Sequence, residues 1–131
     1  MVIEADLRGE DSTVLLVMEI DGQVAGGIQY VEENEPMYRH AGIDIYLADR
    51  FQGRGAGTEA VGLLARFLFE RRGHHRLTID PAAANVRAIR SYTKVGFRPV
   101  GVMRQYERGA DGRFHDGLLM DLLQEELTPD L

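Results

Sequence analysis

The sequence contains no cysteine among its 131 residues. This absence excludes a disulfide, a thiolate metal site and a cysteine nucleophile. No apolar run approaches the roughly 20 residues that a membrane-spanning helix needs. The first ten residues carry three acidic side chains and no apolar stretch, so we expect no secretory signal and, by default, a cytoplasmic location.

The chain also lacks an excess of positive charge, since its formal net charge is −6. Such a balance argues against nucleic acid as the main partner. It suits a small cationic substrate, although solubility alone accounts for it equally well. The length is that of one domain with its own core, and no linker or repeat divides residues 1–131.

The hydrophobic pattern predicts eight elements in the order β-β-β-α-β-α-β-β, a mixed α/β (α+β) fold. Asp21-Gly22 predicts a tight hairpin turn, and the polar stretch from residue 32 to residue 40 predicts a loop. The predicted strands are Thr13–Ile20, Val24–Val31, Ala41–Leu47, Arg76–Asp80, Arg98–Glu107 and His115–Leu123, and the predicted helices are Thr58–Arg72 and Asn85–Val95.

Three glycines, Gly53, Gly55 and Gly57, lie between the third predicted strand and the first predicted helix. A glycine-rich strand-to-helix junction presents free backbone N–H groups and a helix N-terminus to one point in space. Glycine also lets a ligand approach the backbone closely. This run therefore predicts a site for a phosphate-bearing ligand.

Two kinds of phosphate site fit this run poorly. A P-loop requires a lysine beside its last glycine, and none lies near these glycines. A dinucleotide fold fits better, because Gly55-Ala-Gly57-Thr-Glu-Ala60 matches G-x-G-x-x-A and Asp80 lies about where a ribose-binding acid would. However, Ala48–Gln52 separates the strand from the glycines, and the motif follows an antiparallel hairpin. The dinucleotide fold stays the weaker alternative.

Two motifs together carry a family resemblance. Gln52-Gly-Arg-Gly55-Ala-Gly57 is followed, after one strand, by Asn85-Val-Arg-Ala-Ile-Arg-Ser-Tyr92-Thr-Lys-Val-Gly-Phe97. In this order the chain resembles the GCN5-related N-acetyltransferases, the GNAT superfamily, from about Thr13 to Leu123. Gly42-Ile-Asp44 and Asp80-Pro81 look like the aminoglycoside 6′-N-acetyltransferase branch, whereas Asp111–Met120 resembles a broader set that includes ribosomal-protein acetyltransferases.

The resemblance implies a GNAT fold, a mixed and mostly antiparallel sheet with splayed central strands and flanking helices. It implies acetyl-CoA as co-substrate, with the backbone of Gly53–Thr58 holding the pyrophosphate. A bulge would splay the strand Asp44–Leu47 from its neighbour, and a backbone N–H near Leu47 would polarise the acetyl carbonyl. The residues implied to bind the coenzyme are Ile45, Tyr46, Leu47, Gln52, Gly53, Arg54, Gly55, Ala56, Gly57, Thr58, Asn85, Ala88, Tyr92 and Lys94.

Two residues match catalytic positions of the family. Asp44 would bind the acceptor ammonium and take its proton, and Tyr92 would protonate the departing coenzyme A thiolate. The amine would attack the thioester directly in a ternary complex. A core role for Tyr92 and a purely capping role for Asn85 stay open as alternatives.

The acceptor is expected to be a primary amine, and an aminoglycoside-like polyamine is favoured. A peptide or protein N-terminus and a non-catalytic acyl-CoA-binding module are the alternatives. Asp80 would grip a second amine, and the resemblance places Glu32, Glu33 and Glu35 in a loop facing the acceptor, although a solvated loop is the simpler interpretation. His74 and His75 are expected in a loop, His115-Asp116 has no nucleophile to assist, and no metal site, nucleic acid or membrane partner is expected.

One feature departs from the family. Its members open with a strand and two helices, whereas residues 1–12 show no such pattern, so these elements are expected to be missing. Their loss would leave a sheet edge and apolar surface uncovered. We therefore expect either a native start upstream of Met1 or a homodimer in which a partner covers the gap.

Overall fold

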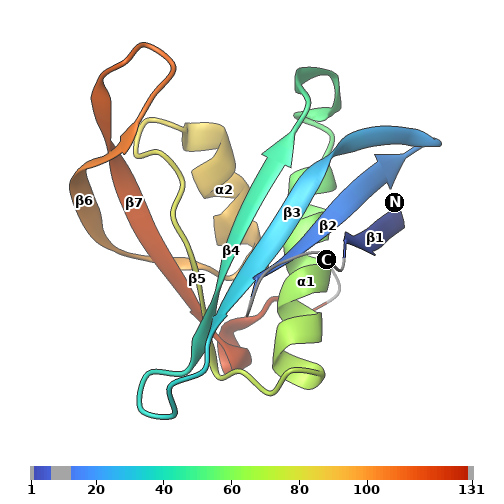
Figure 1. Ribbon diagram of the computed structural model, residues 1–131, viewed down its shortest axis with the longest axis vertical. Coiled ribbons are helices and arrows are strands. Elements are labelled where there is room, and N and C mark those ends of the chain that lie inside the picture. Colours follow the sequence, from blue (N-terminus) through green and yellow to red (C-terminus); the bar gives the residue numbers. More distant parts are fainter. Residues whose placement is uncertain (1, 7–12, 130–131) are drawn as a thin grey trace.

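The structure, a computed structural model, describes residues 2–6 and 13–129, with side chains from residue 13 onward. Seven strands form a single sheet in the order β1-β2-β3-β4-β5-β7-β6 (Figure 1). Every neighbouring pair is antiparallel except β4 and β5, as the mixed fold predicted. The elements are β1 (Val2–Asp6), β2 (Thr13–Ile20), β3 (Gln23–Glu33), β4 (His40–Leu47), the 3₁₀ helix η1 (Asp49–Phe51), α1 (Ala56–Glu70), β5 (Arg76–Ile79), α2 (Val86–Val95), β6 (Arg98–Arg108), β7 (Phe114–Leu123) and the 3₁₀ helix η2 (Gln124–Glu126).

The strand β1 corrects the expectation that the N-terminal strand is missing. It pairs antiparallel with β2, from Val2 opposite Glu19 to Asp6 opposite Leu15. Five residues with two acids give a weak strand pattern by themselves, whereas the apolar β2 supplies a ladder for them to join. No α-helix occurs in residues 2–6 or 13–55.

The parallel seam between β4 and β5 is short. Its pairs are Ala41 with Leu77, Gly42 with Thr78, and Ile43 with Ile79, after which β5 ends. Pro81 follows closely and has no backbone N–H for a ladder. β4 continues through Leu47 beside β3 alone, and the two halves of the sheet separate toward the top of Figure 1.

The predicted splay of the central strands is therefore confirmed, but its expected cause is wrong. A bulge in β4 would shift its register against β3, and this register runs without a shift from His40 to Leu47. The strands diverge because β5 ends at Ile79. The gap beside Asp44–Leu47 therefore results from the end of β5 and not from an irregularity in β4.

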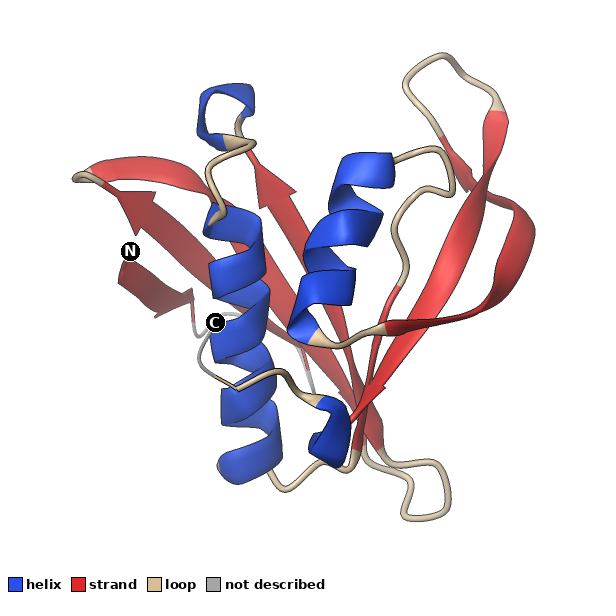
Figure 2. Ribbon diagram, turned by 180° about the vertical axis from the view of Figure 1, so that it is seen from behind, coloured by secondary structure: helices blue, strands red, loops and turns tan. Residues whose placement is uncertain are grey.

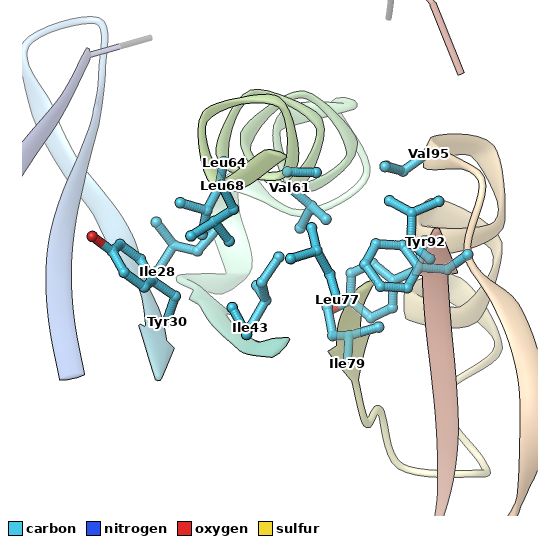
Figure 3. Packing of buried hydrophobic residues seen from close by; sticks show 14 of the residues in the cluster. Ile28, Tyr30, Ile43, Val61, Leu64, Leu68, Leu77, Ile79, Tyr92 and Val95 are labelled. Carbon is cyan, nitrogen blue, oxygen red and sulfur yellow. The ribbon is translucent and has the colours of Figure 1, made fainter. Parts of the chain in front are cut away.

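Both α-helices cover the same face of the sheet, as Figure 2 shows from behind. Val61, Leu64 and Leu68 of α1 are buried in one cluster with side chains of β3, β4 and β5, and Tyr92 and Val95 of α2 join it (Figure 3). α1 begins at Ala56, two residues before the predicted start, because Gly55 takes the N-cap position.

The opposite face of the sheet carries no helix in the described residues. Leu15, Val31 and Tyr46 point to this face and are 38%, 44% and 70% exposed. We call it the open face. Asp44 belongs to it as well, because its neighbours Ile43 and Ile45 alternate toward the helices.

Candidate functional site

A cavity of about 400 Å³ lies on the helix side of the sheet, where β4 runs free of β5. We call it the helix-side pocket. The glycine loop and the start of α1 form one wall, and α2 forms the other. Its lining residues are Ile45, Leu47, Gln52, Gly53, Gly55, Gly57, Thr58, Asn85, Val86, Arg87, Ala88, Arg90, Ser91, Tyr92 and Lys94.

The glycine loop has the backbone that its sequence predicts. Gly53 and Gly55 have φ values of 77° and 78°, a region that glycine enters without strain. Gly57 has an ordinary φ, and a Cβ built on it would lie 3.5 Å from Leu47 Cδ1, an unstrained contact. The fold therefore does not require glycine at 57. Because Gly57 has no side chain, the first backbone amides of α1 stay accessible from the pocket.

Gln52 braces this loop. Its Nε2 donates to the Leu47 carbonyl at 3.0 Å, and its Oε1 lies 3.5 Å from Arg87 Nη1. The side chain thus links the end of β4 to the start of α2.

Eleven of the fourteen residues expected to bind the coenzyme line the helix-side pocket. The other three do not, each for a physical reason. Tyr46 projects from the open face, Arg54 lies over the Phe51 ring with its guanidinium carbon 5.6 Å from the centroid, and the Ala56 side chain is buried.

Sequence reasoning missed several residues of α2 that line the pocket, among them Arg87, Arg90 and Ser91. Positions 87, 91 and 94 recur at helical spacing, so they share one face of α2. This spacing was the available signal. The helix itself begins as predicted, because Asn85 Oδ1 accepts the Ala88 amide at 3.1 Å.

Tyr92 lies at the inner end of the helix-side pocket and is 8% exposed. Burial, together with the negative charges of Asp44 and Asp80, raises the pKa of its phenol to about 12. At neutral pH the phenol is therefore protonated, and it can donate a proton. Its core role and its place in the pocket coexist.

A second cavity, of about 240 Å³, opens on the other side of the sheet. We call it the acidic pocket. Asp44 and Asp80 each follow directly after a member of the last β4–β5 pair, Ile43 with Ile79. The lining residues are Gln29, Val31, Gly42, Ile43, Asp44, Thr78, Asp80 and Tyr106.

The two pockets lie on opposite faces of the sheet, on either side of the gap that opens beyond the last β4–β5 pair. Tyr92 lines the helix-side pocket, and the charges of Asp44 and Asp80 in the acidic pocket contribute to the raised pKa of its phenol. We call this gap the window. It has a proton donor on one side and two carboxylates on the other.

Tyr106 is a site residue that the sequence reasoning did not identify. Its hydroxyl donates to Asp80 Oδ2 at 2.7 Å, and this bond, with burial and the charge of Asp80, raises the pKa of Tyr106 to about 12. Tyr106 belongs to β6, an edge strand with almost every side chain exposed, and its pattern gave no hint of a site.

Two glutamates expected near the acceptor lie elsewhere. Glu32 belongs to β3, which runs two residues past its predicted end, and it is 6% exposed on the helix face. Arg72 donates to it through Nη2 at 2.8 Å and Nε at 3.1 Å, and His74 Nε2 lies 2.6 Å from its Oε2. Glu35 lies in the exposed β3–β4 loop, outside both pockets.

The Glu32 cluster has a clear electrostatic effect. Burial opposes ionisation of Glu32, but the bonds from Arg72 and His74 outweigh it and lower the pKa of the carboxyl. His74 lies in the loop after α1, as expected, and its side chain is buried there. His115 pairs with Asp111 at 2.9 Å and leaves Asp116 to the backbone N–H of Gln105.

Among residues 2–6 and 13–129, no group of His, Asp and Glu side chains is placed to hold a metal ion. Over the same part of the chain, no helix combines the length and apolar character needed to cross a membrane.

Residues 2–97 match the family model described as "Acetyltransferase (GNAT) family". Spermidine N(1)-acetyltransferase of Escherichia coli K12 is 29% identical over 110 residues, 84% of this chain and 58% of its own length. Aminoglycoside N(6′)-acetyltransferase type 1 of Klebsiella pneumoniae is 41% identical over 73 residues, 55% of this chain and 35% of that protein.

Among solved structures, RimJ of Mycobacterium smegmatis in complex with CoA-disulfide superimposes with a TM-score of 0.81. It is 27% identical and covers 91% of this chain, which in turn covers 56% of the RimJ chain. The chain thus spans less than two thirds of the length of the relatives described here. The relatives include the aminoglycoside branch that the sequence resembles.

Proposed function

Because the chain belongs to the acetyltransferase (GNAT) family, we propose that it is an acetyl-CoA-dependent N-acetyltransferase acting on a primary amine. The observation that carries this proposal is the window beside the end of β5, which has Tyr92 in the pocket on one face of the sheet and Asp44 and Asp80 in the pocket on the other. The helix-side pocket takes the coenzyme and the acidic pocket takes the amine. Direct attack in a ternary complex follows from this two-sided arrangement.

The helix-side pocket suits a coenzyme with a pyrophosphate. Backbone N–H groups at the start of α1 and the helix dipole favour bound phosphate oxygens. Arg87, Arg90 and Lys94 add positive charge on the facing helix, within a chain of net charge −6. The free edge of β4 offers a backbone N–H near Leu47 to the thioester carbonyl, an oxyanion-hole element.

Each proton in the reaction has a place. An alkylamine with a pKa of about 10 arrives as the unreactive ammonium, so Asp44 takes its proton directly or through water. The free amine attacks the thioester carbon, an N–C bond forms and the C–S bond breaks. Tyr92 gives its proton to the coenzyme thiolate and regains one, directly or through water, from the second proton that the attached nitrogen loses as the amide forms. The proton held by Asp44 is released to solvent.

The favoured acceptor is an aminoglycoside-like polyamine. Two carboxylates at the window match two ammonium groups on one acceptor, and two relatives carry names for spermidine and aminoglycoside acetylation. A peptide or protein N-terminus is the second candidate, favoured by the open face, which leaves the acidic pocket accessible to a large acceptor.

An amine panel read by thiol release tests the proposal. Spermidine, kanamycin and short peptides are each supplied with acetyl-CoA, and we expect a polyamine to stimulate release most. Release with peptides alone supports the second candidate. Coenzyme binding without release by any amine contradicts the enzyme and leaves an acyl-CoA-binding module.

Asp44→Asn should lower turnover while leaving coenzyme affinity unchanged. The amide cannot take the ammonium proton, and loss of general base help costs about 10²- to 10⁴-fold in rate. Thiol release and calorimetric titration with acetyl-CoA give the two values. The matched control is Asp21→Asn in the β2–β3 turn, where asparagine tolerates the φ of 52°. Equal turnover in Asp44→Asn and the control would remove Asp44 from the mechanism.

A further inference from the structure

The strand β6 carries an irregularity beside the acidic pocket. Its pairing with β7 keeps one register from Gly101 opposite Leu119 to Met103 opposite Gly117, and it resumes at Glu107 opposite His115. Three residues of β6, Arg104 to Tyr106, therefore face the single residue Asp116. Bulges of this kind redirect side chains next to functional sites.

The bulge is held by a specific bond and accepts local strain. Gln105 has a φ of 49°, unusual for a residue other than glycine. Its backbone N–H donates to Asp116 Oδ1 at 2.9 Å, so the carboxylate satisfies the amide that the bulge removes from the ladder. A strained conformation that is fixed in this way points to a use for the residue it displaces.

The displaced residue is Tyr106, whose ring passes over β7 at Gly117. A Cβ at Gly117 would lie 2.8 Å from Tyr106 Cδ2, so only glycine leaves room for the ring. Beyond Gly117 the hydroxyl reaches Asp80 Oδ2 at 2.7 Å. The bulge, Asp116 and Gly117 together carry a phenol from an edge strand into the acidic pocket.

The bond to Asp80 restricts that carboxylate. The terminal torsion of an aspartate is broad and would otherwise leave the group free to rotate. With Oδ2 held by Tyr106, the Oδ1 atom remains for a ligand. A neutral hydroxyl donor also holds the carboxylate without cancelling its charge, whereas a lysine or arginine would compete with a cationic acceptor.

We propose that Tyr106 is an acceptor-positioning residue, which fixes Asp80 so that it receives the second ammonium group of a polycationic acceptor. This inference rests on the proposed function, since it assigns the acidic pocket to the amine. It separates the two carboxylates by task. Asp44 handles the reacting amine, and the Tyr106–Asp80 pair holds a distant one.

Tyr106→Phe removes the hydroxyl and keeps the ring over Gly117. Loss of this hydrogen bond to a charged group leaves Asp80 free to rotate and so weakens its contact with the second ammonium group. We therefore expect the KM for spermidine or kanamycin to rise about tenfold. kcat and the acetyl-CoA affinity should stay within about twofold of the wild type, because the reacting centre is untouched. Tyr38→Phe, at an exposed tyrosine of the β3–β4 loop, is the matched control and should change nothing.

A KM within about twofold of wild type in Tyr106→Phe would overturn the inference, as would a parallel fall in kcat and coenzyme affinity. If no amine is turned over, the proposed function fails, and the same variants are compared by calorimetric titration with spermidine and kanamycin. About tenfold weaker binding by Tyr106→Phe then supports the role of Tyr106. Equal binding by both variants, or none by the wild type, refutes it.

Discussion

Tyr92 combines two demands in one side chain. Its ring belongs to the hydrophobic core, while its hydroxyl responds to carboxylates on the far side of the sheet. A tyrosine meets both demands because its body is apolar and its tip is polar. The sequence identified this residue through its motif, but the charges acting on it depend on where β5 ends.

The raised pKa of Tyr92 predicts a change of stability with pH. An unfolded tyrosine titrates near 10 and folded Tyr92 at about 12, so the unfolded chain loses its proton first as the pH rises. The stabilisation is complete below about pH 10 and is lost toward pH 12. In Tyr92→Phe, the free energy of unfolding should fall less steeply across this window.

Urea unfolding at several pH values between about 9 and 12, a range that covers the interval between the two pKa values, measures this slope. Tyr106 titrates in the same range, so some slope remains in Tyr92→Phe. Tyr38→Phe is the control and should keep the wild-type slope. Identical slopes in all three proteins would contradict the burial of the Tyr92 phenol.

Glu32 shows where residue-level prediction fails. Its neighbours suggested a polar loop, because the glutamates at 32, 33 and 35 are followed by Pro36. The partners that bury it, Arg72 and His74, lie about forty residues away in sequence. No local pattern contains that information, so only the fold shows that Glu32 lies outside the acidic pocket.

At the scale of elements, most of the fold could be predicted from local pattern. Six strands and both helices lie within about two residues of their predicted bounds, the usual uncertainty of element ends. β1 and the β6 bulge were missed for the same reason, because each depends on a partner strand that the local pattern does not contain. β1 depends on its partner strand, and the bulge depends on Asp116 and Gly117 of β7.

The glycine loop allows stability and binding to be separated. Gly57→Ala places a methyl group in ordinary contact with Leu47 and should raise the free energy of unfolding by about 0.5–1 kcal/mol, since alanine favours a helix. The same methyl group covers amides needed for phosphate, so we expect acetyl-CoA affinity to fall about tenfold.

Gly55→Ala provides the contrast. Alanine at its φ of 78° should destabilise the fold by about 1 kcal/mol. Urea unfolding and calorimetry measure both effects. Unchanged coenzyme affinity in Gly57→Ala would show that the ligand does not approach the start of α1.

At the scale of the whole molecule, the Glu32 cluster ties β3 to the segment after α1. Arg39, from the β3–β4 loop, adds bonds to the Arg72 and Gly73 carbonyls at 2.6 and 2.9 Å. The cluster lies at the end of the sheet away from the window. It therefore stabilises the frame without entering the chemistry, whereas the homodimer that would cover the open face stays a prediction.

Glu32→Gln should lower the free energy of unfolding at pH 7 by about 1.5–3 kcal/mol, the range for hydrogen bonds to a charged group. The folded pKa of Glu32 is lowered, so its contribution is present above the unfolded pKa of about 4.3 and is lost as the pH falls through the folded value. The difference between variant and wild type should therefore shrink in acid.

Urea unfolding at pH 7 and in acid tests this, with exposed Glu33→Gln as the control. Turnover per folded molecule should stay at the wild-type level. A Glu32→Gln protein as stable as the control at pH 7 would show that the cluster contributes little.

The shortness of the β4–β5 seam also sets the order of assembly. The β2–β3 and β6–β7 hairpins close over short loops, so their contacts cost little chain entropy and form early. The seam joins strands separated by the whole of α1 and is held by only a few residue pairs, so we expect it to form last. Catalytic competence would then arise only at the final folding step, and partly folded chains would carry neither a coenzyme site nor an acceptor site.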